Sequence, residues 1–350
     1  VPTDQVITAK ENAAQVPYSF SNQEIQPNTV FKDLTDSLNI AYQQKEIDFP
    51  DFNIQKLLPH KLSEYGPSMA AGDVNGDGLD DIVCGGSFSY STTILLQQPN
   101  GKFIVKDLIP GASPQTKPTE DMGLLLFDAD GDGDLDLYIA SGSYENAPNS
   151  PAYEDHLYIN DGKGNFSLAK NALPQNLTSK SCVRAVDIDK DGDLDLFVAG
   201  RVEPWNYPKP VSSYIYRNDS KNGVIKFTDV TNSVAKDLNN IGLVCDAVWT
   251  DFDNDGWQDL ILAGEWMSIR FLKNDKGVLK DISKISGVNG QTGWWTSILP
   301  GDFDNDGDVD YILGNTGKNT FYRVDSLHPA RIYAKDFDNN GSYDAIPSLY

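Results

Sequence analysis

The stretch GDVNGDGLDDIVCGG at residues 72–86 joins an acidic nine-residue loop to an apolar run. Its loop follows the pattern Asp-x-Asp/Asn-x-Asp/Asn-Gly-x-x-Asp. This pattern occurs six times, and its first Asp recurs at intervals of 55, 59, 64, 51 and 34 residues. The six copies span 73–81, 128–136, 187–195, 251–259, 302–310 and 336–344. Such repetition indicates a chain built from similar structural units.

Apolar runs flank each loop, as in GLLLF before Asp128 and DLYIAS from Asp136 onward. Most units add a third run, and several add a fourth, such as VKDL at 105–108 and FTDV at 227–230. Short apolar runs between Gly, Asn and Asp turns are typical of strands, and four strands per unit are typical of a propeller blade. We therefore predict an all-β fold, a β-propeller with four-stranded blades and a metal loop between the first and second strands.

The pattern also predicts the domain organisation. Residues 1–30 are polar and irregular and read as a linker or leader, and 31–350 form the propeller. FKDL at 31–34 has the form of a fourth strand and is predicted to complete the last blade. Only two strands are expected in the sixth unit, so we expect about five and a half blades here and seven in a longer parent protein. A six-bladed ring closed by residues 31–34 is the alternative.

The repeated loop suits Ca²⁺, which binds six to eight hard oxygen ligands. Side chains at positions one, three, five and nine and the carbonyl at position seven are the candidate ligands of about six Ca²⁺ sites. These positions are Asp73, Asn75, Asp77, Leu79 and Asp81; Asp128, Asp130, Asp132, Asp134 and Asp136; Asp187, Asp189, Asp191, Asp193 and Asp195; Asp251, Asp253, Asp255, Trp257 and Asp259; Asp302, Asp304, Asp306, Asp308 and Asp310; and Asp336, Asp338, Asn340, Ser342 and Asp344.

Other interpretations of the loops fit less well. Acidic solvated turns would not need six copies in one register. An EF-hand ends in Glu at position twelve between helices, Mg²⁺ seldom uses such cages, and transition metals favour His or Cys. Without metal, each loop would crowd three or four like charges together. The sequence therefore predicts that calcium contributes to folding.

Composition limits the partners. The formal net charge of −23 repels nucleic acid and anionic membrane surfaces. No apolar stretch has the length of a membrane helix. Cys84, Cys182 and Cys245 lie in apolar runs and are expected to be buried free thiols rather than a disulfide and one unpaired cysteine.

The loops and their flanks resemble the FG-GAP/VCBS repeats of integrin-α-like propellers, over roughly residues 31–350. The segments 58–81 and 31–40 are similar to large cell-surface proteins of Bacteroidetes-type bacteria related to the cartilage acidic protein (ASPIC/UnbV) group. RVEPWNYPKP at 201–210 is similar to a loop of that group. The resemblance implies calcium binding, secretion or surface anchoring, with a lipid anchor as one possibility, and adhesion-like or glycan-related roles. The short fifth unit and the truncated sixth unit depart from the family pattern.

Loops on the face opposite the metal loops are rich in aromatic residues, which suit a sugar or an extracellular protein partner. The candidate ligand-binding residues are Tyr144, Glu145, Arg201, Glu203, Trp205, Tyr207, Trp266, Trp294 and Trp295. Core packing is the alternative for each of them, and Trp249 is expected in the core.

The sequence predicts a binding or adhesion module, or a subunit of a surface complex, without enzymatic activity. His60, His156 and His328 lie in no recognisable catalytic motif. A propeller-type polysaccharide lyase or other glycan-active enzyme is the alternative, because some polysaccharide lyases use calcium-bearing propellers. A lyase would need a base beside an exposed calcium in a basic cleft, and the sequence shows no such constellation. A structural spacer in a larger surface protein is a third hypothesis.

Overall fold

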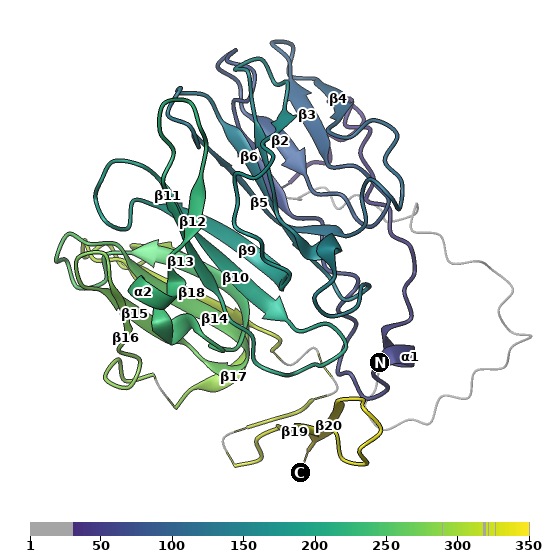
Figure 1. Ribbon diagram of the computed structural model, residues 1–350, viewed down its shortest axis with the longest axis vertical. Coiled ribbons are helices and arrows are strands. Elements are labelled where there is room, and N and C mark those ends of the chain that lie inside the picture. The colour runs from purple at the N-terminus through teal and green to yellow at the C-terminus, as the bar shows by residue number, and fades with distance from the viewer. Residues whose placement is uncertain (1–30, 289, 318–319, 321, 326, 350) are drawn as a thin grey trace, which may run out of the picture.

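The computed structural model describes residues 31–288, 290–317, 320, 322–325 and 327–349, and the regular secondary structure of these residues is almost entirely β (Figure 1). Residues 1–30, the predicted linker or leader, lie outside the described residues. The helical segments are single turns: α1 (Asp51–Ile54), α2 (Thr231–Val234), η3 (Pro151–Tyr153) and η4 (Lys236–Leu238). No helix in the described ranges is long and apolar enough to cross a bilayer.

Each of the first four units is an antiparallel sheet whose strands pair in chain order, as a propeller blade requires. The strands are β1 (Met69–Gly72), β2 (Asp81–Cys84), β3 (Thr93–Gln97) and β4 (Phe103–Asp107); β5 (Glu120–Phe127), β6 (Asp136–Gly142), β7 (His156–Ile159) and β8 (Ser167–Leu168); β9 (Ser179–Val186), β10 (Asp195–Val202), β11 (Tyr214–Asn218) and β12 (Phe227–Asp229); and β13 (Leu243–Thr250), β14 (Asp259–Ser268), β15 (Arg270–Asn274) and β16 (Leu279–Asp281).

Units five and six are two-stranded hairpins in the described part of the chain. They consist of β17 (Thr292–Gly301) with β18 (Asp310–Asn315), and β19 (Arg331–Lys335) with β20 (Asp344–Ser348). The sequence leaves open whether the fifth unit has an outer strand. In the described residues, this unit has no strand besides β17 and β18. Each predicted acidic loop does connect the first strand of its unit to the second.

The units stack side by side along an arc (Figure 1). The first strands β1, β5, β9, β13 and β17 contact one another in that order. Apolar side chains from neighbouring units interdigitate between the sheets: Phe197 and Ile215 of unit three pack with Leu260 and Leu262 of unit four. Every residue of the second strands β6 and β10 is buried, because the neighbouring sheets cover both faces of these strands. This burial explains why the second strands read as continuous apolar runs rather than alternating ones.

The predicted closing strand at 31–34 is wrong. These residues form no strand, and Phe31 is 88% exposed. The following residues instead cover the first unit: Phe103 N donates to Leu38 O at 3.0 Å, and Ile40 packs on the cluster around Leu95. The apolar residues after the FKDL motif therefore bind the first blade rather than the last.

Residues 51–65 form a plug on the end of the units opposite the first five acidic loops. Leu58 and Leu62 pack with Tyr144, Tyr207 and other buried residues from the connections that follow second strands. Gln55 of the plug contacts three parts of the chain, donating to Tyr207 O at 3.0 Å and to Tyr343 O at 2.5 Å and accepting from the Tyr144 hydroxyl. The plug thus joins units two, three and six.

The sixth hairpin contacts this plug rather than the end that holds the other acidic loops. Ile332 and Ala345 pack in the plug cluster beside Leu58. The sequence predicts that all six loops lie on one face. In the structure, the sixth hairpin instead contacts the plug at the opposite end.

Candidate metal centres

Each acidic loop is held in shape by the carboxylate of its first aspartate. In the second loop, Gly131 N donates to Asp128 Oδ1 at 2.7 Å and Gly133 N donates to Asp128 Oδ2 at 3.0 Å. The backbone at these fourth and sixth positions is left-handed, with φ of 78° and 93°. Glycine and asparagine adopt this conformation most readily. Their preference explains why Gly or Asn occupies the fourth position of five loops, and glycine the sixth position of all six.

The ninth-position aspartate connects the loop to the rest of the blade. Ala129 N donates to Asp136 Oδ2 at 2.9 Å, and Asn160 N, at the end of the third strand, donates to Asp136 Oδ1 at 2.8 Å. The equivalent aspartates Asp81, Asp195 and Asp259 accept the same pair of bonds. All four are almost completely buried. The sequence interpretation assigned this residue to the metal shell only and missed its structural role.

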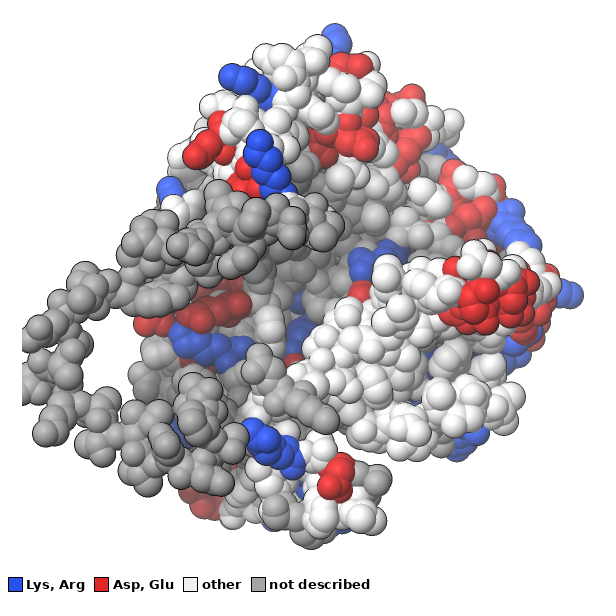
Figure 2. Space-filling model, turned by 180° about the vertical axis from the view of Figure 1, so that it is seen from behind, with Lys and Arg blue, Asp and Glu red and all other residues white. Residues whose placement is uncertain are grey.

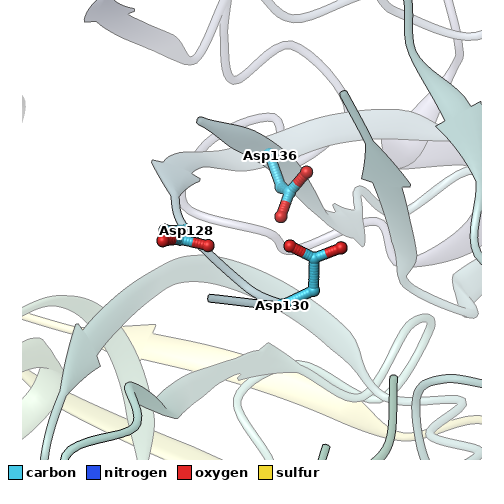
Figure 3. A group of neighbouring side chains, drawn as sticks. All are labelled: Asp128, Asp130 and Asp136. Atoms are coloured by element: carbon cyan, nitrogen blue, oxygen red, sulfur yellow. The ribbon is translucent and has the colours of Figure 1, made fainter. Parts of the chain in front are cut away.

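Five loops bring three carboxylates together. In the second loop, Asp128, Asp130 and Asp136 point toward one another from the loop and the start of β6 (Figure 3). One oxygen from each lies within 4.8 Å of the others. The other groups are Asp187, Asp189 and Asp195; Asp251, Asp253 and Asp255; Asp302, Asp304 and Asp306; and Asp336, Asp338 and Asp344. These sets come from the predicted ligands, and the seventh-position carbonyls remain a prediction.

The electrostatics of the loops fit a hard divalent cation. Burial, with a smaller effect from the carboxylates of Asp130 and Asp134, raises the pKa of Asp136 to about 6. Burial likewise raises the pKa of Asp195 to about 7. Asp134 Oδ1 is buried without a hydrogen-bond partner. Oxygen-only groups with uncompensated negative charge are the donor sets that Ca²⁺ prefers.

The fourth loop differs because a lysine reaches it. Lys273 Nζ lies 2.9 Å from Asp255 Oδ2 and also contacts Asp253. An ammonium group there offsets part of the charge that would hold a cation. We expect this loop to bind Ca²⁺ less tightly than the second and third.

An asparagine at the end of the third strand links each of the first three loops to the next blade. Asn218 Nδ2 donates to Ala129 O, inside the acidic loop of the preceding unit, at 3.2 Å, while its backbone N donates to Asp195 Oδ1 at 2.8 Å. Asn160 contacts Val74 O and Asn274 contacts Ile188 O in the same way. The Asn-Asp pairs at 160–161, 218–219 and 274–275 are the sequence signal for this link. The acidic loops therefore lie at the contacts between blades.

Replacing Asn218 with Ala is expected to lower the free energy of unfolding by about 1–3 kcal/mol, because a buried carbonyl loses its donor. Urea denaturation of the variant measures this change. Asn53→Ala, at an exposed position of α1, is the control and should change stability by less than about 0.5 kcal/mol. Equal stability of the two variants would contradict the inter-blade role.

The sequence model for the FG-GAP-like repeat matches residues 73–139, 128–198 and 251–313. Together these matches cover more than half of the chain, and each begins at the first aspartate of an acidic loop. The chain belongs to the FG-GAP-like repeat family. No curated protein sequence matches the chain.

Solved structures similar to this FG-GAP-like chain share little sequence with it. A lectin of Agrocybe aegerita, described by its recognition of non-reducing terminal N-acetylglucosamine, is 17% identical over 80% of this chain and 74% of its own, with a TM-score of 0.45. The Tc holotoxin pore of Photorhabdus luminescens is 16% identical over 81% of this chain and 11% of its own, with a TM-score of 0.31. The V. cholerae biofilm matrix protein Bap1 is 15% identical over 73% and 35%, also with a TM-score of 0.31.

The face opposite the FG-GAP loops is less open than the sequence suggests. Tyr144 and Tyr207 have no exposed surface, and Arg201 is 5% exposed. The plug at 51–65 covers them, since Leu58 and Leu62 pack on both tyrosines. The prediction that these three residues form an accessible ligand surface is therefore wrong.

Arg201 instead belongs to a buried polar network. Its Nη2 lies 2.5 Å from Glu265 Oε1, and the Tyr207 hydroxyl donates to Glu265 Oε2 at 2.9 Å. His60 Nε2 of the plug lies 3.2 Å from Glu265 Oε1. Burial alone would raise the pKa of Glu265, but the charge of Arg201 and the contacts with His60 and Tyr207 lower it to about 2. Glu265 was not among the predicted site residues, because one glutamate in an apolar run gives no signal of its partners.

Trp266 and Trp294 remain partly exposed at the edge of this network. Their ring centroids lie 5.8 Å apart, and the His60 ring lies 4.7 Å from that of Trp294. Trp266 also lines a cleft of about 310 Å³ with Ser268 and Arg270. Three other candidates contact neighbouring parts of the chain. Glu203 pairs with Lys209, Trp205 Nε1 donates to Tyr144 O, and Trp295 Nε1 donates to Gln291 O.

Three smaller predictions can be compared with the structure. Cys84, Cys182 and Cys245 are free thiols, as expected. Trp249 packs against the main core cluster, also as expected. Figure 2 shows acidic side chains gathered in patches on the surface, with Lys and Arg scattered between them.

Proposed function

We propose that this FG-GAP-like protein is an extracellular or cell-surface Ca²⁺-binding propeller that acts as a binding or adhesion module. The observation that carries the proposal is the placement of carboxylate groups at the contacts between blades. A cation bound there would stabilise the assembled blades, and extracellular modules bind Ca²⁺ with Kd values of about 10⁻⁴–10⁻³ M. The ion is therefore expected to be bound where free calcium is high.

The ligand that we propose is a glycan or an extracellular protein, bound at the cleft beside Trp266 and Trp294. Aromatic faces next to polar groups suit the apolar faces and hydroxyls of sugars, and they serve equally as anchors for a protein partner. The resemblance of 201–210 to the cartilage acidic protein group supports a role in a surface complex. Anchoring to a bacterial outer membrane by a lipid belongs to this proposal.

Replacing Trp266 or Trp294 with Ala is expected to weaken ligand binding at least tenfold, because Trp266 lines the cleft and the Trp294 ring lies 5.8 Å from the Trp266 ring. Glycan-array screening and capture of envelope proteins identify a ligand, and titration of the variants with that ligand measures the loss. Tyr90→Ala, which removes an exposed aromatic ring of unit one, is the control. Full binding by both tryptophan variants would place the ligand elsewhere.

We further propose that binding occurs without catalysis. A lyase is the second candidate because the His60 and Tyr65 side chains lie 2.6 Å apart near Arg201. Within the plug, His60 contacts Glu265 and Tyr65 contacts His60 and Arg201, and this engagement disfavours contact with a polysaccharide. Formation of unsaturated sugar from an acidic polysaccharide, lost in His60→Ala, would favour the lyase instead.

A further inference from the structure

A second set of acidic residues lies away from the FG-GAP loops, where the plug meets units one and two. Glu120 begins β5 and is 2% exposed. Neither of its carboxylate oxygens has a hydrogen-bond partner. A buried carboxylate without donors costs several kcal/mol unless a proton or a cation neutralises it.

A side-chain contact of the neighbouring loop brings a second carboxylate, Glu145, toward Glu120. Asn146 Nδ2 donates to Pro118 O at 2.9 Å, which holds the loop carrying Glu145 beside the start of β5. Glu120 pairs with Gly142, the last residue of β6, and Glu145 lies three residues later, in the loop that leaves β6. Glu145 Oε2 is also buried without a partner.

The third carboxylate comes from the segment that leads into the plug. Ser87 Oγ donates to Lys45 O, and Asp121 N donates to Gly86 O at 3.0 Å. These two contacts bring the segment that carries Glu46 to the first residues of β5; Glu46 itself is exposed and accepts a hydrogen bond from Gln44 Nε2 at 2.6 Å. The charges of Glu145 and Glu46 both raise the pKa of Glu120, after the larger effect of burial, to about 10.

Lys117 offsets only part of the charge of this set: it lowers the pKa of Glu120 and of Glu145, but burial and the neighbouring carboxylates outweigh it. Lys117 Nζ lies 3.0 Å from Asp121 Oδ1 and donates to Gly86 O at 3.1 Å and to Thr119 O. Its donors are therefore directed at other groups. Ser143 directly follows β6, and its buried Oγ is a further oxygen without a hydrogen-bond partner.

We propose that Glu46, Glu120 and Glu145 form a divalent cation site for Ca²⁺, separate from the six loops. The donors are hard oxygens, and the almost complete burial of Glu120 suits an ion rather than a larger organic cation. Unlike the five loop groups, these carboxylates do not all come within 4.8 Å of one another. The ion is therefore expected to draw these carboxylates together or to contact some of them through water. Bound there, it joins the plug segment to units one and two.

Equilibrium dialysis with CaCl₂ at pH 8 tests the site in the full chain. The wild type is expected to bind one more Ca²⁺ per chain than Glu120→Gln, while the loop sites remain in both. Glu64→Gln, a change to a surface carboxylate paired with Lys61, is the matched control and should bind as the wild type does. If Glu120→Gln does not fold, Glu145→Gln replaces it, because Glu145 is only partly buried.

Equal Ca²⁺ binding by the wild type and the glutamine variant would overturn the proposal. A buried proton would then neutralise Glu120, and Glu120→Gln would raise the melting temperature at pH 8 with or without calcium. The raised pKa of Glu120 means that its protonated form is lost from the folded state only as the pH rises toward 10. Absence of Ca²⁺ from the acidic loops would be a different result. It would lower the number of bound ions in the wild type and in every variant, whereas loss of the Glu120 site lowers it in the glutamine variant alone.

Discussion

Chelation of calcium is expected to lower the melting temperature of this protein by well over ten degrees. A ligand that binds only the folded state stabilises it by about 1.4–2.7 kcal/mol per site when the free ligand exceeds Kd ten- to a hundredfold. Several loops would lose their ions together, and about 1 kcal/mol shifts the melting temperature of a large domain by about 2 °C. Removal of Ca²⁺ also restores repulsion among the aspartates of each loop. Differential scanning calorimetry in excess EGTA measures the effect.

Two controls make this prediction specific. Adding Ca²⁺ back beyond the chelator should restore the original melting temperature, whereas Mg²⁺ should restore less, because it keeps its waters and seldom uses such loops. Asp128→Asn removes one negative charge from the second loop and should reduce the calcium-dependent shift by about one site's share. A melting curve unchanged in EGTA would contradict metal stabilisation of the fold.

Arg201→Met is expected to cost about 3–5 kcal/mol of folding free energy, because it leaves the buried Glu265 carboxylate without its guanidinium partner. Arg217→Met removes a comparable pair with Asp219, but that arginine side chain is 42% exposed. Exposed pairs contribute about 0–1 kcal/mol, so the control should lose little. Denaturant unfolding of the two variants compares the buried and exposed pairs. Similar losses in both would contradict the role assigned to the network beneath the plug.

The same network predicts a pH dependence. The pKa of Glu265 is lowered to about 2 from its ordinary 4.5. Its contribution to stability is therefore present above about pH 4.5 and is lost as the pH falls toward 2. The difference in stability between the wild type and Arg201→Met should shrink over this range. A constant difference from pH 6 to pH 2.5 would show that the carboxylate is not stabilised by its partner.

Local sequence was enough to predict the repeated features. The acidic loops lie between first and second strands because Gly at position six and Asp at positions one and nine fix the turn within a few residues. Apolar runs such as DLFVAG were recognisable as strands because a run of this kind follows every acidic loop. These features depend on contacts near in sequence, which a pattern of nine residues can encode.

Long-range contacts explain the failures. FKDL at 31–34 has the composition of a fourth strand, but the neighbouring Leu38 and Ile40 pack on the first blade instead. Tyr144 and Tyr207 look like ligand-binding residues because their loops are aromatic and polar, yet the plug covers them. The asparagine link was missed because Asn218 contacts Ala129, 89 residues away. The Asn-Asp pairs mark the asparagine link in the sequence, but nothing near these residues in the sequence identifies the distant groups that they contact.

An anomalous difference map from crystals grown with Tb³⁺ in place of Ca²⁺ tests the central claim most directly. The account predicts peaks enclosed by the carboxylates of the acidic loops, strongest in the second and third and weaker in the fourth, where Lys273 competes. Empty loops with intact blades would contradict it, because the carboxylates would then be solvated turns without a role in assembling the propeller.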